Sequence, residues 1–187
     1  MSLTTLDAKT ALVVIDLQQG IVPLVAPQVA AQVVQHASAL AAAFRRHGLP
    51  VVLVNVAGAA PGRSEQMRSL SELPTGWTDL VAELDQQPQD HLVTKYSWGA
   101  FTNTDLQAFL QQQGVTQLVL AGVSTSIGVE STARAAYELG FNLTLALDAM
   151  TDSNPDAHQH SVTRIFPRLG ETGSSQQIID LLDQTHA

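Results

Sequence analysis

Short apolar segments of strand length alternate along this chain with longer segments of helical period. The strand-length segments cover residues 11–16, 50–56, 91–95, 117–123 and 141–148, and helices are predicted over 26–48, 102–114, 154–166 and 174–184, with a further amphipathic helix after the fourth strand. Strands that are apolar on both faces and separated by helices are typical of a parallel sheet covered on both sides. The pattern predicts a three-layer α/β/α fold with a mostly parallel, Rossmann-like sheet of about six strands.

The composition fits one compact domain spanning residues 1–187. Of these residues 45% are hydrophobic and 14% are charged, which is typical of a globular protein with a full core. The net charge is -8, and the nine Lys and Arg residues are spread along the chain, so we expect no nucleic-acid partner. The start of the chain lacks a targeting pattern and no apolar run reaches membrane-spanning length, so we expect a cytoplasmic protein that does not enter the membrane.

Cysteine is absent from the chain. This excludes disulfides, a thiolate nucleophile and cysteine-ligated zinc. Histidine offers no metal pair either, because His158 and His160 are two residues apart and face different sides of the predicted helix. We therefore expect neither a metal ion nor another cofactor.

The residues directly after each predicted strand are the first candidates for a functional site. In a parallel sheet of this kind, ligands bind outside the carboxyl ends of the strands. This rule selects Asp16, Asn55 with the loop after it, Lys95, 124–128 and 148–152. Asp16 follows a wholly apolar strand, so a surface-turn aspartate is the less favoured interpretation.

The turn after the fourth strand resembles three known strand-to-helix motifs only in part. Gly122 and Gly128 lie six residues apart, but no lysine follows as a phosphate loop requires, and the dinucleotide fingerprint lacks its middle glycine. The segment "GVSTS" approaches a nucleophile elbow centred on Ser124, with Asp148 and then His158 or His160 later in the chain. A serine hydrolase is thus one alternative, and hydroxyls that only cap the following helix are another.

Three segments in this order and spacing resemble the isochorismatase-like, or cysteine hydrolase, family. They are "ALVVIDLQQGIV" at 11–22, "VTKYSWGAFTNTDLQAFL" at 93–110 and "LVLAGVSTSIGVESTARAAYELGFNLTLALDAMTD" at 118–152. The resemblance covers essentially the whole chain. It implies that Asp16 is the acid/base residue, that Lys95 is its partner, and that Gly128 occupies the place where most members carry the nucleophilic cysteine.

Glycine at position 128 implies a reaction without a covalent intermediate. The branch of the family that lacks the cysteine, the isochorismatases proper, cleaves a vinyl ether by proton transfer and addition of water. Asp16 would be the general acid, or it would act as a base toward water while Lys95 binds an anionic substrate. Burial would raise the pKa of Asp16 and the Lys95 ammonium would lower it, so the residues alone leave both roles open. A non-catalytic protein that binds a small anion is the third alternative.

The resemblance also implies several structural details. A cis peptide bond is expected between Val123 and Ser124, and members of the family commonly form dimers or larger assemblies, so a homo-oligomer is expected. The metal site of nicotinamidases needs an Asp-x-His after the second strand, which this chain lacks.

Several side chains are candidates for binding a small, anionic substrate. Ser124 and Ile127 lie in the turn after the fourth strand. Arg63 and Arg68, in the loop after the second strand, could bind a carboxylate or could be merely solvated. Trp98 and Phe101 could wall the pocket or could pack in the core. Asp148 and Asp152 are interpreted as turn formers and helix caps rather than catalysts.

Overall fold

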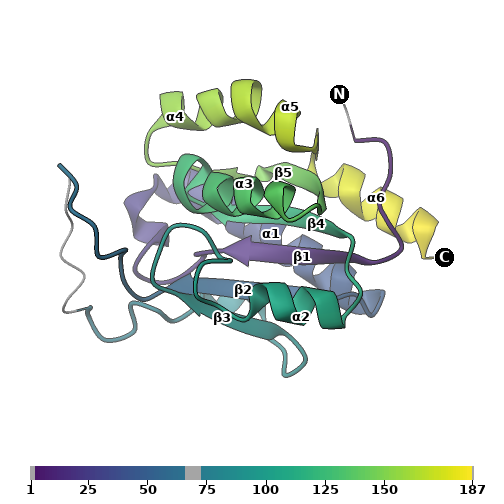
Figure 1. Ribbon diagram of the computed structural model, residues 1–187, viewed down its shortest axis with the longest axis horizontal. Coiled ribbons are helices and arrows are strands. Elements are labelled where there is room, and N and C mark those ends of the chain that lie inside the picture. Colours follow the sequence, from purple (N-terminus) through teal and green to yellow (C-terminus); the bar gives the residue numbers. More distant parts are fainter. Residues whose placement is uncertain (1–2, 66–72, 187) are drawn as a thin grey trace.

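A six-stranded sheet with helices on both faces forms the centre of the molecule (Figure 1). The structure is a computed structural model that describes residues 3–65 and 73–186. The strands are β1 (Thr10–Ile15), β2 (Val51–Val56), β3 (His91–Lys95), β4 (Gln117–Val123), β5 (Asn142–Thr151) and β6 (Glu171–Gly173). The helices are α1 (Pro27–Arg46), α2 (Leu106–Gln112), α3 (Glu130–Glu138), α4 (Pro155–His160), α5 (Phe166–Leu169) and α6 (Ser175–Thr185).

The strand order is β3-β2-β1-β4-β5-β6, and all five neighbouring pairs are parallel. The chain therefore winds outward from β1 in one direction and, after β4, outward in the other. The predicted three-layer, Rossmann-like fold of about six strands is confirmed, and the sheet is wholly parallel. The carboxyl ends of the strands meet at one edge, on the left of Figure 1, where β1 points.

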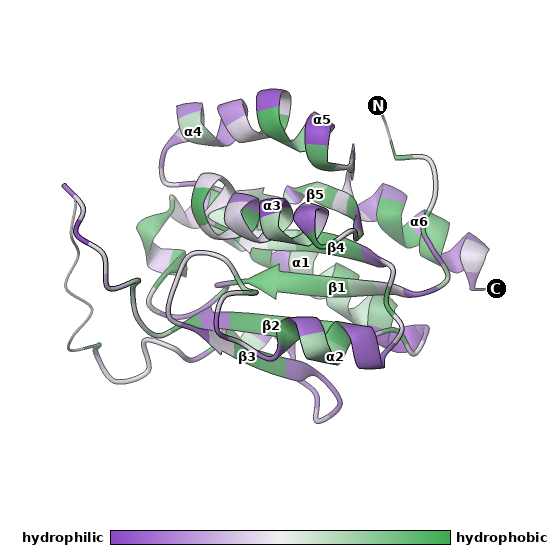
Figure 2. Cartoon of the chain, viewed as in Figure 1, coloured by the Kyte–Doolittle hydropathy of each residue, from purple (hydrophilic) through white to green (hydrophobic). Residues whose placement is uncertain are grey.

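Two apolar layers hold the helices against the sheet. Leu12 and Val14 of β1 face the layer under α1 and α6, whereas Val13 and Ile15 face the layer under α2, α3 and α5. This alternation follows from the two-residue period of a strand, and it explains why β1 is apolar on both faces. Figure 2 shows β1 and β4 green along most of their length, while several of the outer helices carry purple, hydrophilic residues on their exposed sides.

Local signals set three of the helix ends. Gly48 follows α1 with a φ of 66°, the left-handed conformation that the predicted C-cap requires. The Asn154 side chain accepts hydrogen bonds from the amides of Asp156 and Ala157, with Pro155 at the first position of α4 as expected. Ser174 forms a capping box with the third residue of α6.

Most predicted boundaries agree within two residues, but three elements differ more and one strand was not predicted. β5 extends past residue 148 to Thr151, because it resumes pairing with β4 after a bulge opposite 120–122. The helix predicted over 154–166 is α4, a π-helical turn over Ser161–Ile165, and α5. The helix predicted over 102–114 begins only at Leu106, since the chain first makes a series of turns. The sixth strand is β6, which no apolar run indicated.

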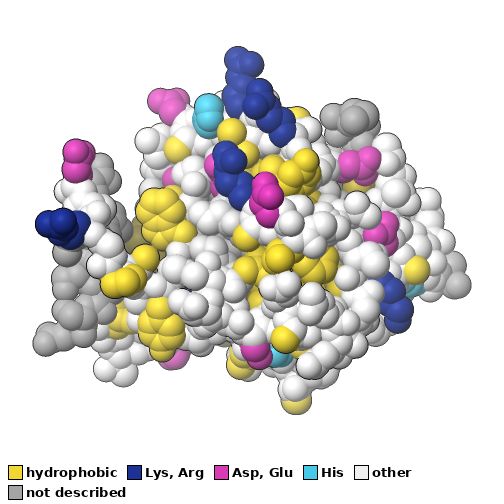
Figure 3. Space-filling view, in the orientation of Figure 1, with side chains coloured by type: hydrophobic (Ala, Val, Ile, Leu, Met, Phe, Trp, Pro, Cys, Tyr) yellow, Lys and Arg dark blue, Asp and Glu magenta, His cyan; other side chains and the backbone are white. Residues whose placement is uncertain are grey.

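Charged side chains are sparse on the face drawn in Figure 3, where a group of basic residues lies over α3 and α5. None of the helices in the described part of the chain combines the length and the apolar character that a membrane span requires.

Candidate active site

The centre of the sheet is where its winding direction reverses, between β1 and β4. Open α/β sheets bind ligands outside the carboxyl ends of the strands at such a point. Asp16 directly follows β1, and Ser124 directly follows β4. Gly122, beside Ile15 in the paired register, has a φ of 118°, and a Cβ there would lie 2.0 Å from the Ile15 carbonyl oxygen. Only glycine lets the two strand ends approach this closely.

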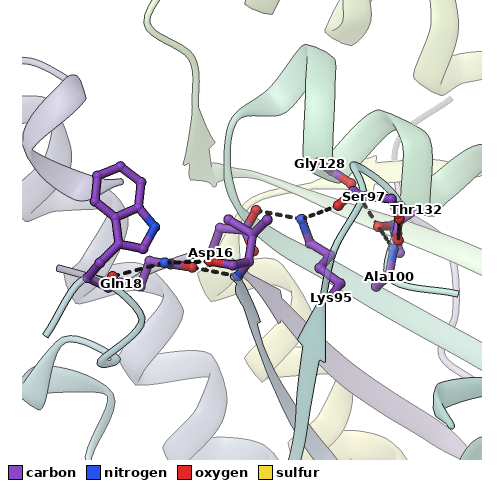
Figure 4. A network of polar contacts seen from close by, with 10 residues as sticks. Asp16, Gln18, Lys95, Ser97, Ala100, Gly128 and Thr132 are labelled. Carbon is purple, nitrogen blue, oxygen red and sulfur yellow. Dashed lines mark hydrogen bonds and ion pairs between the residues drawn. The ribbon is translucent and has the colours of Figure 1, made fainter. Parts of the chain in front are cut away.

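A buried ion pair lies at this edge. Nζ of Lys95 donates a hydrogen bond to Oδ2 of Asp16 over 2.8 Å and a second to the carbonyl oxygen of Ser97 over 3.1 Å (Figure 4). Lys95 is 1% exposed and Asp16 is 5% exposed. The predicted convergence of these two residues, 79 positions apart in the chain, is therefore present in the structure.

The carboxyl group of Asp16 binds a proton more tightly than an ordinary aspartate does. Burial raises its pKa from the usual 3.8 to about 6, and the charge and hydrogen bond of Lys95 offset only part of that effect. Its second oxygen, Oδ1, is buried and has no hydrogen-bond partner among the described residues. The sequence left open whether burial or the Lys95 ammonium has the larger effect on the pKa of Asp16. In the structure burial has the larger effect.

The backbone at Asp16 adopts a conformation that side-chain-bearing residues rarely take. Its φ is 51°, in the left-handed region, while its amide donates to the carbonyl oxygen of Val54 on β2. Non-glycine residues in this region cluster at functional sites, where the surrounding structure holds them. This conformation at the end of β1 is independent support for a functional role of Asp16.

The turn after β4 brings Gly128 against the ion pair. The peptide bond between Val123 and Ser124 is cis, as the family resemblance implied. Residues Thr125–Val129 then form a π-helical turn that leads into α3. A Cβ built on Gly128 would lie 3.3 Å from Oδ2 of Asp16 and 2.9 Å from Cγ2 of Ile15. A side chain at position 128 would therefore point into the site, next to the carboxyl group.

Asp152, rather than a hydroxyl of the turn, caps this helix start. Its Oδ2 accepts from both the amide and the hydroxyl of Ser126 over 2.8 Å, and its Oδ1 accepts from the amide of Asn154. Ser124 makes no side-chain cap bond, although its carbonyl oxygen accepts from two later amides of the turn. The interpretation of Asp152 as a cap is confirmed, whereas a capping role for the Ser124 hydroxyl is wrong because the carboxylate supplies the acceptor.

The residues of a possible serine triad lie apart. Asp148 accepts from the amide and hydroxyl of Ser175 at the start of α6. Nδ1 of His158 lies 2.8 Å from Oγ1 of Thr125, and burial lowers the pKa of His158 although Asp152 nearby raises it. Neither side chain hydrogen-bonds to Ser124 in the described part of the chain. Asp148 is therefore a helix-capping residue, as expected.

Gln18 is a site-forming residue that the sequence analysis did not assign. Its side chain is fully buried; Oε1 accepts from the amide of Val56, and Nε2 donates to the carbonyl oxygens of Val56 and Trp77. These bonds hold the chain after Asp16 against the end of β2 and against the loop between β2 and β3, which contains Trp77. The glutamine of the D-x-Q motif was visible, but its partners are distant in sequence.

The remaining predicted site residues divide into two groups. Trp98 is 65% exposed and Ile127 is 38% exposed, and both follow strand ends at the edge that carries Asp16. Phe101 instead stacks on Phe141, which directly precedes β5, with ring centroids 6.1 Å apart. That packing favours the core alternative for Phe101, because Phe141 lies at the opposite end of the strands.

The two loop arginines were predicted to lie near the substrate. Arg63 is exposed in an irregular segment after β2. Arg68 lies outside the described residues. No group of three or more His, Asp or Glu residues within 3–65 and 73–186 is arranged to hold a metal ion.

A cavity also lies away from the Asp16–Lys95 pair. It has a volume of about 760 Å³ and is lined mainly by apolar residues of α1 and of two short 3-10 turns, Val22–Leu24 and Ala82–Leu84. It contains none of Asp16, Lys95 or Gly128. The buried ion pair and the left-handed conformation of Asp16 lie at the strand ends instead.

Both the sequence and the fold of this chain are similar to those of known isochorismatase family proteins. Residues 10–177 match the family model described as Isochorismatase domain. The isochorismatase family protein YecD of Escherichia coli O157:H7 is 43% identical over 185 residues, which cover 95% of this chain and 98% of YecD. An isochorismatase family protein from Burkholderia thailandensis superposes with a TM-score of 0.92 at 41% identity, covering 97% of this chain and all of the other.

A more distant relative carries the name of a specific hydrolase. The ureidoacrylate amidohydrolase RutB of Pseudomonas savastanoi pv. phaseolicola is 28% identical over 183 residues, covering 82% of this chain and 75% of RutB.

Proposed function

The chain belongs to the isochorismatase family of hydrolases, and from this premise we propose that it cleaves a small anionic vinyl ether by acid–base catalysis without a covalent intermediate. Asp16 is the proton donor and Lys95 is its cationic partner. The observation that carries the proposal is the buried Asp16–Lys95 pair beside Gly128 in a chain without cysteine.

The reaction begins with transfer of the Asp16 proton to the methylene carbon of the enol ether. The double-bond electrons form the new C–H bond, and the ether carbon becomes an oxocarbenium ion. Water adds to that carbon and gives up a proton, which restores the Asp16 carboxyl group. The hemiketal hydroxyl then loses its proton as its carbon–oxygen bond to the ring breaks, and the leaving ring oxygen gains a proton. For isochorismate the products are pyruvate and a dihydroxy diene acid.

The pKa of Asp16 suits this role. A general acid works best when its pKa is near the working pH, and the value of about 6 leaves about one carboxyl group in ten protonated at pH 7. After the proton leaves, the carboxylate faces the Lys95 ammonium at 2.8 Å. Lys95 therefore stabilises the anion that the proton transfer creates.

Gly128 contributes space rather than a reacting group. Cysteine hydrolases of this family attack with a thiolate from the corresponding position, and here a side chain would lie within 3.3 Å of Oδ2 of Asp16. Leaving that place free lets water or substrate approach the carboxyl group. Trp98 and Ile127 are the exposed apolar side chains offered to the substrate from the same edge.

A coupled assay tests the proposal. Purified protein is given isochorismate, and pyruvate is followed with lactate dehydrogenase. We expect turnover by the wild type and by S124A, and a large loss of turnover by D16N. Labelling of Ser124 by a fluorophosphonate probe, with loss of activity in S124A, would instead establish the serine hydrolase. Tight anion binding without turnover of enol ethers, amides or esters would establish a degenerate binding protein.

A further inference from the structure

Two segments outside the sheet contribute to the site around Asp16 and Lys95, and they contact each other beyond the strand ends. The irregular segment after β3 carries Ser97, whose carbonyl oxygen accepts a hydrogen bond from Lys95. The π-helical turn before α3 carries Gly128. Neither segment is paired in the sheet, so their relative position depends on contacts between them.

Thr132, in the first turn of α3, forms such a contact. Its hydroxyl donates to the carbonyl oxygen of Gly128 over 2.7 Å and accepts from the amide of Ala100 over 3.1 Å. Figure 4 shows this bridge beside the pair formed by Asp16 and Lys95. Thr132 and Ala100 are both 0% exposed, so water does not replace either bond.

The direction of the bridge is fixed by the single hydroxyl proton. That proton is used by the Gly128 carbonyl oxygen, which leaves a lone pair for the Ala100 amide. The other polar group of Ala100 is also held, since its carbonyl oxygen accepts from the Thr104 hydroxyl over 2.5 Å. The segment after Lys95 is therefore anchored at Ala100 through both of its backbone groups.

We propose that Thr132 is a positioning residue, which holds the segment after Lys95, with the Ser97 carbonyl oxygen that binds the Lys95 ammonium, against the turn carrying Gly128 and so fixes the ion pair with Asp16. This inference rests on the proposed function in assigning the ion pair a catalytic role. A helical threonine often back-bonds to the carbonyl four residues earlier, and that bond alone would be structural. The hydrogen bond from the Ala100 amide, 32 residues earlier in the chain, is not part of such back-bonding, and it is the bond that supports a positioning role.

The test follows the Asp16 carboxyl group directly and needs no substrate. Protein labelled with ¹³C at the aspartate carboxyl carbons is titrated by NMR, and the Asp16 signal is assigned with D16N. The variants are T132V, which keeps the shape but loses the hydroxyl, and T132S, which keeps the hydroxyl. The control is T144V, because Thr144 is equally buried and its hydroxyl accepts from Gln117 near the opposite end of the sheet.

We expect the pKa of Asp16 to rise by at least about half a unit in T132V, because a displaced Lys95 stabilises the carboxylate less. In T132S and T144V it should stay within about 0.2 units of the wild type. An unchanged pKa in T132V, with a loss of unfolding free energy no larger than that of T144V, would overturn the proposal. T132A also lacks the hydroxyl and takes the place of T132V if that variant does not fold.

Activity provides a second measurement that separates the two proposals. If isochorismate is turned over, T132V should lower kcat about tenfold with a smaller change in KM, and T132S should restore it. If isochorismate is not a substrate, the titration result still decides the role of Thr132.

Discussion

The Lys95 ammonium reaches across the end of β2 to the Asp16 carboxyl group, and their Nζ and Oδ2 atoms lie 2.8 Å apart. β3, which ends in Lys95, and β1 are separated by β2, which places them about 10 Å apart in the sheet. Only a long side chain spans that gap. The pair is therefore a product of strand order as much as of residue type.

Asp16→Asn should remove most of the catalysis, and it should also lower the unfolding free energy because it leaves the buried Lys95 ammonium without its carboxylate. Asparagine keeps the size of the side chain but cannot donate a carboxylic proton, so kcat should fall by about 10² to 10⁴. Steady-state pyruvate release measures the effect. S124A is the matched control, since its hydroxyl makes no hydrogen bond among the described residues, and D16N with wild-type kcat would remove Asp16 from the mechanism.

Activity should fall as pH rises through about 6. The general acid must be protonated, and the pKa of Asp16 is raised to about 6, so kcat/KM for isochorismate should be highest below this pH and then decrease about tenfold per unit. A pH–rate profile from 4.5 to 9 gives the slope. A rate that instead increases through this range would assign Asp16 the role of base toward water.

Lys95→Met should destabilise the protein more at high pH than at low pH. Without the ammonium, the pKa of the buried Asp16 carboxyl rises further above about 6. A raised folded-state pKa favours folding at low pH, and that contribution is lost as pH increases. The difference in unfolding free energy between K95M and the wild type should therefore grow above pH 6. Removing one partner of a buried pair costs about 3–5 kcal/mol of unfolding free energy.

Urea unfolding of K95M at pH 5 and pH 8 measures this difference. K9M is the control, because Lys9 is exposed. The double variant D16N/K95M should lose the pH dependence. Equal destabilisation of K95M at both pH values would show that the Asp16 charge does not matter to its stability.

Gly128→Ala should affect turnover more than folding. Its methyl group would lie 2.9 Å from Cγ2 of Ile15, a stiff β-branched side chain that must shift. Alanine favours a helix over glycine by about 1 kcal/mol, which offsets part of the cost of that shift. The same methyl group fills the space beside Oδ2 of Asp16. Pyruvate release and urea midpoints separate the two effects, and unaltered kcat in G128A would show that this space is not used.

Gly122→Ala provides the contrasting case. Its Cβ would lie 2.0 Å from a backbone oxygen of β1, and its φ of 118° is strained for any L side chain. Since a strand cannot yield as a side chain does, G122A should lose several kcal/mol of unfolding free energy or fail to fold.

Much of the fold could be predicted because apolar periodicity is a local signal. The predicted strands match β1 to β5, and Asp16, Lys95 and Gly128 were selected by their places at strand ends and by the family resemblance. The extension of β5 to Thr151 could not be predicted, because it depends on pairing with β4 beyond a bulge. The role of Gln18 in joining these segments was not predicted, because its hydrogen-bond partners Val56 and Trp77 are 38 and 59 residues away in the chain.

The sequence by itself thus placed Asp16, Lys95 and the turn over 124–128 at the carboxyl edge of the sheet, and it determined that no thiolate is among their side chains. The tertiary structure decided that Lys95 meets Asp16 across β2, that Thr132 joins Ala100 to Gly128, and that burial outweighs the ammonium in setting the pKa of Asp16. The physical reason is the range of the interactions. Strand and helix patterns depend on neighbouring residues, whereas ion pairing, bridging and desolvation depend on distances that exist only after distant segments have packed together.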